Sequence, residues 1–133
     1  MVQLDERLGA IAQLVLETVS DQESPCVVDV GCAHGQLTSH LLERCERLCM
    51  IASDVSAPSL EKAKRLFAQK GFGERAHTVV ADGLGGVDRA VDVIVMAGMG
   101  AQTILKIITE GREKIGSAKL IMQANVDLPM LRM

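Results

Sequence analysis

The sequence predicts one α/β domain over residues 1–133, built on a mostly parallel β-sheet with helices on both faces. Short apolar runs alternate along the chain with segments whose apolar residues recur at helical spacing. Apolar strands that alternate with helices are typical of a parallel sheet joined by right-handed crossovers. With 48% hydrophobic and 23% charged residues, the chain can bury one core.

The first half of the chain predicts two helices and two strands. In order, these are a helix over 4–19, a polar break at 21–25, a strand over 26–30, a helix around 37–42 and a strand over 48–52. Leucine, isoleucine and valine at helical spacing define the helices, and Cys26–Val30 is apolar enough to be a buried strand. The second strand leads into Ser53 and Asp54.

The second half continues the alternation. It predicts a helix over about 58–70, a strand over 77–81, a strand over 91–97, a helix from 101 to about 115 and a strand over 119–123. Pro58 suits a helix start, where its missing N–H does least harm, and Gly71 and Gly73 close that helix. The run 91–97 is rich in β-branched residues, which favours a strand.

Composition narrows the cellular setting. No apolar run reaches the roughly 18 residues that span a bilayer, and the N-terminus lacks the apolar segment of a signal peptide. We therefore expect a cytoplasmic protein without membrane contact and with its four cysteines reduced. Cys45 and Cys49 are four apart on a predicted helix, but no second pair at ligand spacing completes a metal site, so we expect no metal.

Charge and aromatic content argue against a strong RNA-binding face. The net charge is −3, and the basic residues are dispersed. The chain has no Trp or Tyr and only two Phe residues, so it offers few surfaces on which a base could stack. Phe67 is expected in the core of a helix, which leaves Phe72 in a glycine-flanked loop.

The loop after the first strand carries a glycine pattern. Ligands of such sheets bind beyond the carboxyl ends of the strands, and Gly31 and Gly35 allow a tight turn there, before a helix with free N–H groups. A dinucleotide fingerprint would need glycine where the chain has Ala33 and Gln36. The methyltransferase pattern Asp-x-Gly-x-Gly-x-Gly fits better, with Asp29 matching and Ala33 as a mild replacement. A plain strand-to-helix turn is the alternative.

Acidic residues end the next two strands. Asp54 lies about 20 residues beyond the glycines, where an acid can bind both ribose hydroxyls, and Asp82 could accept from an adenine amino group. The alternatives are a helix N-cap for Asp54 and a simple Asp-Gly turn for Asp82. Together the three loops predict an S-adenosylmethionine site formed by Asp29, Gly31, Cys32, Ala33, Gly35, Asp54, Val55, Asp82, Gly83, Leu84, Ala97, Gly98 and Met99.

Two further loops complete this edge of the predicted sheet. Gly98-Met99-Gly100 follows the fourth strand, and Gln123-Ala124-Asn125 follows the fifth. The amides of Gln123 and Asn125 could orient a substrate base by its edge. The alternative is that they satisfy the backbone of the loop, which is the commoner role of Asn.

Several segments resemble one enzyme family. Ala97-Gly-Met-Gly-Ala101, Leu120-Ile-Met-Gln-Ala-Asn125 with the following Leu131-Arg132, and Leu4-Asp-Glu-Arg-Leu8 resemble the bacterial tRNA (adenine-N1)-methyltransferases that modify adenine 22. The resemblance covers nearly the whole chain and implies a Rossmann-like fold of the class I methyltransferase type. It also implies methyl transfer from S-adenosylmethionine to N1 of an adenine in tRNA, with His34 and Asn125 as the candidate catalytic residues.

The chain also departs from this family. Where the family has the loop Gly-Ser-Asp-His-Ala, this chain has Gly31-Cys-Ala-His-Gly35, so Ala33 replaces the family's aspartate. Where the family has Gln-Pro-Asn, this chain has Gln123-Ala-Asn125. The usual methyltransferase sheet has seven strands, whereas this chain ends after the predicted fifth, without the family's C-terminal helical extension. A fragment, a methyltransferase for a small molecule or protein, and a non-catalytic cofactor-binding module are the alternatives. The unpaired fifth strand also predicts self-association through the sheet edge.

Overall fold

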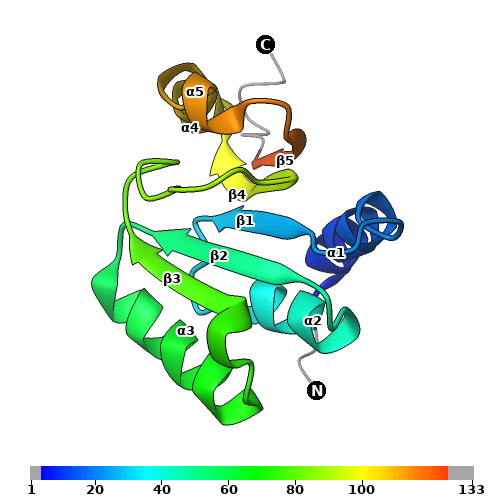
Figure 1. Cartoon of the computed structure of the whole chain (residues 1–133). Helices are drawn as coiled ribbons and strands as arrows, with labels where there is room; N and C mark the ends of the chain where they lie inside the picture. Colours follow the sequence, from blue (N-terminus) through cyan, green and yellow to red (C-terminus); the bar gives the residue numbers. More distant parts are fainter. Residues whose placement is uncertain (1–3, 126–133) are drawn as a thin grey trace.

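A five-stranded parallel sheet forms the centre of the molecule (Figure 1). A computed structural model describes residues 4–125. The strand order is β3-β2-β1-β4-β5, and every neighbouring pair is parallel. The strands are β1 (Cys26–Val30), β2 (Cys49–Asp54), β3 (Ala76–Val80), β4 (Val93–Gly100) and β5 (Lys119–Asn125). The predicted α/β class with a parallel sheet is confirmed.

Helices cover both faces of the sheet. They are α1 (Glu6–Thr18), α2 (Gln36–Arg44), α3 (Ala57–Lys70), α4 (Ala101–Glu110) and α5 (Arg112–Ile115), with a 3-10 turn at Gly73–Arg75. Helices α1, α2 and α3 share one core with the sheet, whereas α4 packs into a second core on the opposite face (Figure 1). Within β1, Val27 faces the first core and Val28 the second, as parallel strands buried on both sides require. None of the described helices is long and apolar enough to span a bilayer.

Three features of the predicted elements differ notably from the structure. The predicted helix over 101–115 breaks at Gly111, where a Cβ atom would lie 2.7 Å from Leu84 Cδ1 and 2.9 Å from the carbonyl oxygen of Ile107. Strand β4 begins two residues later than predicted and continues through Gly100. The segment 98–100, which was expected to be a loop, therefore belongs to the strand. Cys45 ends α2 and Cys49 begins β2, so this pair does not share a helix.

The loop between β1 and α2 has an unusual backbone. Gly31 (φ +71°), Ala33 (φ +51°) and Gly35 (φ +80°) are all left-handed, so the conformation repeats at every second residue. A Cβ at Gly31 would approach Met99 Cε to 2.8 Å, and one at Gly35 would approach Phe67 Cζ to 2.7 Å. Both glycines are therefore needed for packing as well as for their φ angles. Ala33 adopts the same conformation with a side chain, at an energetic cost.

We expect Ala33→Gly to raise the free energy of unfolding by about 0.5–1 kcal/mol, because relief of left-handed strain exceeds the entropy that glycine adds to the unfolded chain. Urea denaturation of both proteins measures this difference. The control is Ala68→Gly at an exposed position of α3, which should lose about 1 kcal/mol because glycine disfavours a helix. Equal losses in the two variants would show that Ala33 is not strained.

Candidate functional site

Two cavities adjoin Gly31 at the carboxyl ends of the strands. The first, of about 290 Å³, is lined by Arg7, Leu8, Asp29, Gly31, Cys32, Ala33, His34, Gln36, Leu37, Ala97 and Gly98. The second, of about 190 Å³, is lined by Val30, Gly31, Asp54, Val55, Ala81, Asp82, Gly83, Met99, Thr103 and Ile107. Gly31 lines both, so the first loop forms the wall between them. This is the edge of the sheet at which the sequence predicted a ligand.

Most of the predicted cofactor residues line these cavities. The exceptions are Gly35, which packs against α3, and Leu84, whose side chain is buried in the second core and borders a separate cavity. The side chain of Leu84 therefore lies outside both cavities, and a cofactor role for this residue stays a prediction. His34 is exposed on the wall of the first cavity, whereas Asn125 lines neither cavity.

The first loop is fastened to the end of β2 by three successive amides. Gly31 N and Cys32 N both donate to the carbonyl oxygen of Ser53, at 2.7 and 2.9 Å, and Ala33 N donates to Asp54 Oδ2 at 2.9 Å. The other carboxylate oxygen of Asp54 accepts from Ser56 N at 2.9 Å. Asp54 thus joins two loops of the candidate site. The N-cap of α3 is Ser56, so the N-cap alternative for Asp54 is wrong.

Asp29 supplies a buried carboxyl group to the wall of the first cavity. The residue is 4% exposed, and its carboxyl group accepts a hydrogen bond of 2.9 Å from Thr38 Oγ1 in the first turn of α2. Burial raises the pKa of the Asp29 carboxyl to about 7; the Thr38 hydrogen bond opposes this rise, and the nearby Asp54 carboxylate adds to it. A cation in the cavity would favour the ionised form of Asp29.

Two helices direct groups suited to an anion at the first cavity, whose acid, Asp29, comes from β1. Gly35 is the N-cap of α2 and provides no side-chain hydrogen bond to the first turn, and Gln36 and Leu37 of that turn line the cavity. A helix start of this kind favours an anion. Arg7 of α1 adds a guanidinium group to the same wall. The cavity therefore presents an acid in Asp29 and two groups suited to an anion.

Sequence reasoning did not assign a site role to Arg7. Its signal lay in the Leu4-Asp-Glu-Arg-Leu8 segment, but the residue is far along the chain from the loops that it meets. Arg7 Nη1 donates to Asn125 Oδ1 at 3.4 Å, and its guanidinium nitrogens lie 3.8 Å from the position of a Cβ at Gly98. Sequence reasoning also missed the role of Thr38, because its hydroxyl group reaches Asp29 only once the first turn of α2 has formed.

The side chains of Gln123 and Asn125 hold the backbone of Gly98. Gly98 N donates to Gln123 Oε1 at 3.0 Å, and the Gly98 carbonyl oxygen accepts from Asn125 Nδ2 at 2.8 Å. Gly98 is left-handed, at φ +74°, and the pairing of β4 with β5 shifts register between Ala97 and Met99. Both polar groups of this bulge are satisfied by side chains of β5. The structure thus favours the alternative in which these amides satisfy backbone groups.

Cys32 does not supply a reactive thiolate to this site. Burial raises the pKa of its thiol to about 12, and the carboxylates of Asp29 and Asp54 add to the rise. Within residues 4–125, no three His, Cys, Asp or Glu side chains lie close enough together to hold a metal ion.

We expect Asp29→Asn to stabilise the ligand-free protein at pH 8 by about 2–4 kcal/mol and to give no gain at pH 4. The folded protein holds the Asp29 proton up to about pH 7, whereas the ordinary value is 3.8. Protonation therefore favours the fold, and this contribution is lost as the pH rises through 7. Asparagine stays neutral and still accepts from Thr38.

Urea denaturation at pH 4, 6 and 8 measures this effect. The control is Asp88→Asn, because Asp88 is exposed and pairs with Arg89 at 3.1 Å, so its removal should not stabilise the fold. A wild-type protein that remained more stable than Asp29→Asn at pH 8 would show that the buried carboxylate is favourable to the fold.

Comparisons with known proteins agree with this geometry. The chain matches the family model described as "Methyltransferase domain" over residues 4–133. A tRNA (adenine(22)-N(1))-methyltransferase of Bacillus subtilis is 25% identical over 133 residues, which cover 98% of this chain and 53% of the relative.

Two solved structures share the fold. The B. subtilis M1A22 tRNA methyltransferase has a TM-score of 0.83 at 25% identity, covering 99% of this chain and 55% of that one. A Streptococcus pneumoniae protein in complex with S-adenosyl-L-methionine has a TM-score of 0.81 at 29% identity, covering 98% and 59%. The chain thus spans a little over half the length of these proteins. Because the family model covers nearly all of it, the chain belongs to the methyltransferase-domain family.

Proposed function

We propose that the chain binds S-adenosylmethionine across Gly31, with the amino-acid half in the first cavity and the adenosine half in the second. The observation that carries this proposal is the pair of cavities on either side of one left-handed glycine. In the first cavity, the Asp29 carboxylate suits the ammonium group and the sulfonium charge of the ligand. Arg7 and the first turn of α2 suit its carboxylate.

The second cavity fits a nucleoside. Asp54 lies at the end of β2, where each carboxylate oxygen accepts one backbone N–H and keeps a second lone pair for a ribose hydroxyl. Val55 is 68% exposed and joins Met99 and Ile107 in an apolar wall against which an adenine ring can lie. Asp82 is exposed on the same wall, where its carboxylate can accept from the adenine amino group.

We propose that the reaction is methyl transfer to N1 of an adenine in tRNA. When bound, S-adenosylmethionine supplies an electrophilic methyl group on its sulfonium sulfur. N1 of neutral adenine has an in-plane lone pair and needs no strong base, so alignment and exclusion of water account for most of the rate. His34, exposed on the wall of the first cavity, offers the incoming base a hydrogen bond. Asn125 supports the site through Gly98 and Arg7.

The described residues offer little surface for RNA. The chain has a net charge of −3. Phe72, expected in an open loop, is in fact buried against Phe67, with ring centroids 6.3 Å apart, so neither ring can stack on a base. We propose that tRNA binding depends on a region beyond this domain, because the relatives are almost twice as long. A cytoplasmic location agrees with a tRNA substrate and is part of the proposal.

The sheet edge at β5 supports a further part of this proposal. Strand β5 has no neighbour beyond it among the described residues, and Met122 on it is 50% exposed. An unpaired strand of this kind favours contact with another chain. We propose self-association through this edge unless another segment covers it.

We expect S-adenosylmethionine and its demethylated product to bind at least roughly tenfold more tightly than NAD, a difference of about 1.4 kcal/mol. Calorimetry with the three ligands measures this difference. Asp54→Ala should lose affinity for the first two, because a charge-assisted hydrogen bond is worth about 1.5–3 kcal/mol. Tighter binding of NAD, or binding unchanged by Asp54→Ala, would contradict the proposed site.

We expect this chain to methylate tRNA at a rate roughly 100-fold or more below that of the B. subtilis relative, because few phosphate-binding cations are available to it. The assay uses labelled S-adenosylmethionine and unmodified tRNA, with the methyl group mapped to N1 by mass spectrometry. A tRNA with guanine at the target position is the control.

Equal rates for the two proteins would show that the described domain binds tRNA by itself and would contradict our account of substrate binding. Cofactor binding without methyl transfer to any tRNA would favour a non-catalytic cofactor-binding module. Methyl transfer to a protein would favour a methyltransferase that acts on a small molecule or protein.

A further inference from the structure

Two cysteines lie opposite each other on neighbouring strands, away from the cofactor cavities. Cys26 begins β1 and Cys49 begins β2, and the two are direct partners in the parallel register. Both belong to the core on the α4 face of the sheet. Neighbouring strands are about 4.7–4.9 Å apart, which falls within the Cα separations that disulfides span, about 4.4–6.8 Å. Both thiols are free in this structure.

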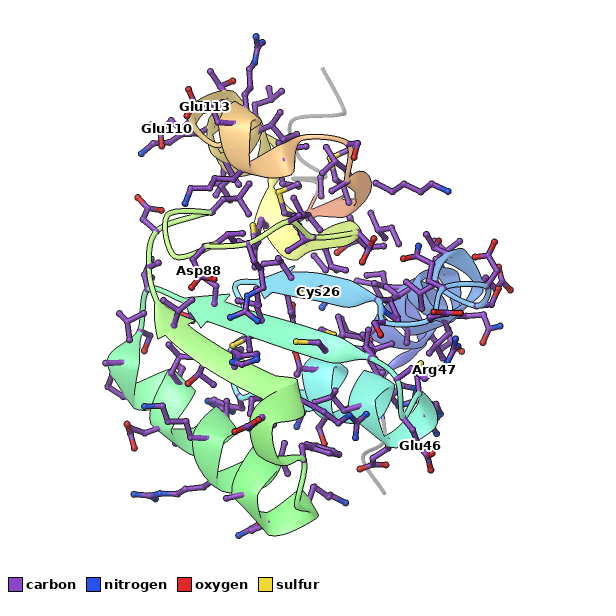
Figure 2. All side chains as sticks on the ribbon, viewed as in Figure 1. Cys26, Glu46, Arg47, Asp88, Glu110 and Glu113 are labelled. Atoms are coloured by element: carbon purple, nitrogen blue, oxygen red, sulfur yellow. The ribbon has the colours of Figure 1, made fainter. Side chains whose placement is uncertain are left out.

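The thiols differ in exposure. Cys26 is buried at 9% exposure, and Cys49 is half-buried. Figure 2 shows Cys26 on β1 and Asp88 in the loop that crosses this side of the sheet. That loop continues to Asp92, whose Oδ2 accepts from Cys26 N at 2.8 Å. Cys49 is therefore the thiol that a small molecule reaches first.

A positive charge accompanies the pair. The Arg89 guanidinium interacts electrostatically with both thiols. It also lines a cavity of about 460 Å³ together with Val87 and Val91 of the same loop. A small oxidant in this cavity would lie beside Arg89, the residue that interacts with both sulfur atoms.

We propose that Cys26 and Cys49 form an oxidisable dithiol, a modification site for hydrogen peroxide that is separate from the cofactor site. The Cys49 thiolate attacks one peroxide oxygen, the O–O bond breaks, and the released hydroxide takes a proton to leave as water. This step leaves a sulfenic acid on Cys49. The Cys26 sulfur then attacks that sulfur, and the S–S bond forms as the S–O bond breaks, with loss of a second water. The dithiol loses two electrons and two protons.

The surroundings of Cys26 protect its thiol from the first step. Burial raises the pKa of its thiol to about 12, and the neighbouring Cys49 adds to this rise, whereas Arg89 opposes it. Conversion of Cys49 to a neutral sulfenic acid removes the repulsion between two thiolates. Burial continues to protect Cys26 from the oxidant, and the parallel register places its sulfur opposite the Cys49 sulfenic acid that it attacks.

The other two cysteines lack this arrangement. Cys32 lies in the glycine loop beside Asp29 and Asp54, whose charges disfavour its thiolate. Cys45 is buried at the end of α2 and packs in the core on the opposite face of the sheet. Neither is a register partner of another cysteine in the described strands. Oxidation should therefore select Cys26 and Cys49.

The test treats the reduced full chain with hydrogen peroxide and measures its intact mass and free thiols. We expect the loss of two hydrogen atoms and two thiols, reversed by dithiothreitol. Cys26→Ala and Cys49→Ala should each abolish this loss, and the matched variants Cys32→Ala and Cys45→Ala should retain it. Circular dichroism confirms that each variant is folded.

Arg89→Gln gives a second measurement that leaves all four cysteines in place. Because this change removes the positive charge that attracts both sulfur atoms, we expect oxidation to slow by roughly threefold or more. Arg65→Gln, at an exposed position of α3, is the control and should leave the oxidation rate unchanged. The proposal is overturned if wild type gains only oxygen atoms, if the disulfide persists in Cys26→Ala or Cys49→Ala, or if Arg89→Gln oxidises at the wild-type rate.

Discussion

The candidate site depends on the attachment of the glycine loop to the end of β2. Three successive amides of the loop donate to Ser53 and Asp54. These bonds fix Gly31 as the wall between the two cavities, and the second oxygen of Asp54 fixes the turn into α3. One carboxylate thus sets the relative positions of the loops after β1 and β2. A ribose hydroxyl would bind a group that is already held in place, which lowers the entropic cost of binding.

The site is formed at a cost in stability. Ala33 is strained, and Asp29 is a carboxyl group that burial makes difficult to ionise. Such features persist where the surrounding structure holds them and where function uses them. A buried carboxylate that disfavours the ligand-free fold becomes favourable when a cation binds beside it. The same cavity wall therefore accounts both for a weakness of the free protein and for the affinity that we propose for a charged ligand.

The fold was predictable from the sequence because buried parallel strands are continuous apolar runs. All five strands were found, with boundaries correct to within three residues. The break at Gly111 was not predictable, because it depends on contact with Leu84, which is distant in sequence. The burial of Phe72 was missed for a different reason: its flanking glycines were interpreted as a loop, whereas the turn after α3 packs the ring against Phe67.

The site was predictable in its residue types and less so in its contacts. The spacing of glycines and acids at strand ends located both cavities, since parallel strands end at one edge of a sheet. The contacts depend on strand register and on a bulge, which no local sequence pattern reveals. Two backbone amides donate to Asp54, and the side chains of Gln123 and Asn125 form hydrogen bonds with the backbone of Gly98. Arg7 was missed because the residue to which it donates a hydrogen bond, Asn125, lies 118 positions away in the sequence.

The position of the cofactor is tested most directly by NMR of the chain saturated with S-adenosylmethionine, using intermolecular nuclear Overhauser effects. The proposed site predicts contacts from the adenine and ribose protons to Val55 and Met99, and from the methionine protons to Leu37 and Ala97. Contacts in the reverse arrangement, or to residues outside the two cavities, would contradict the assignment of the site.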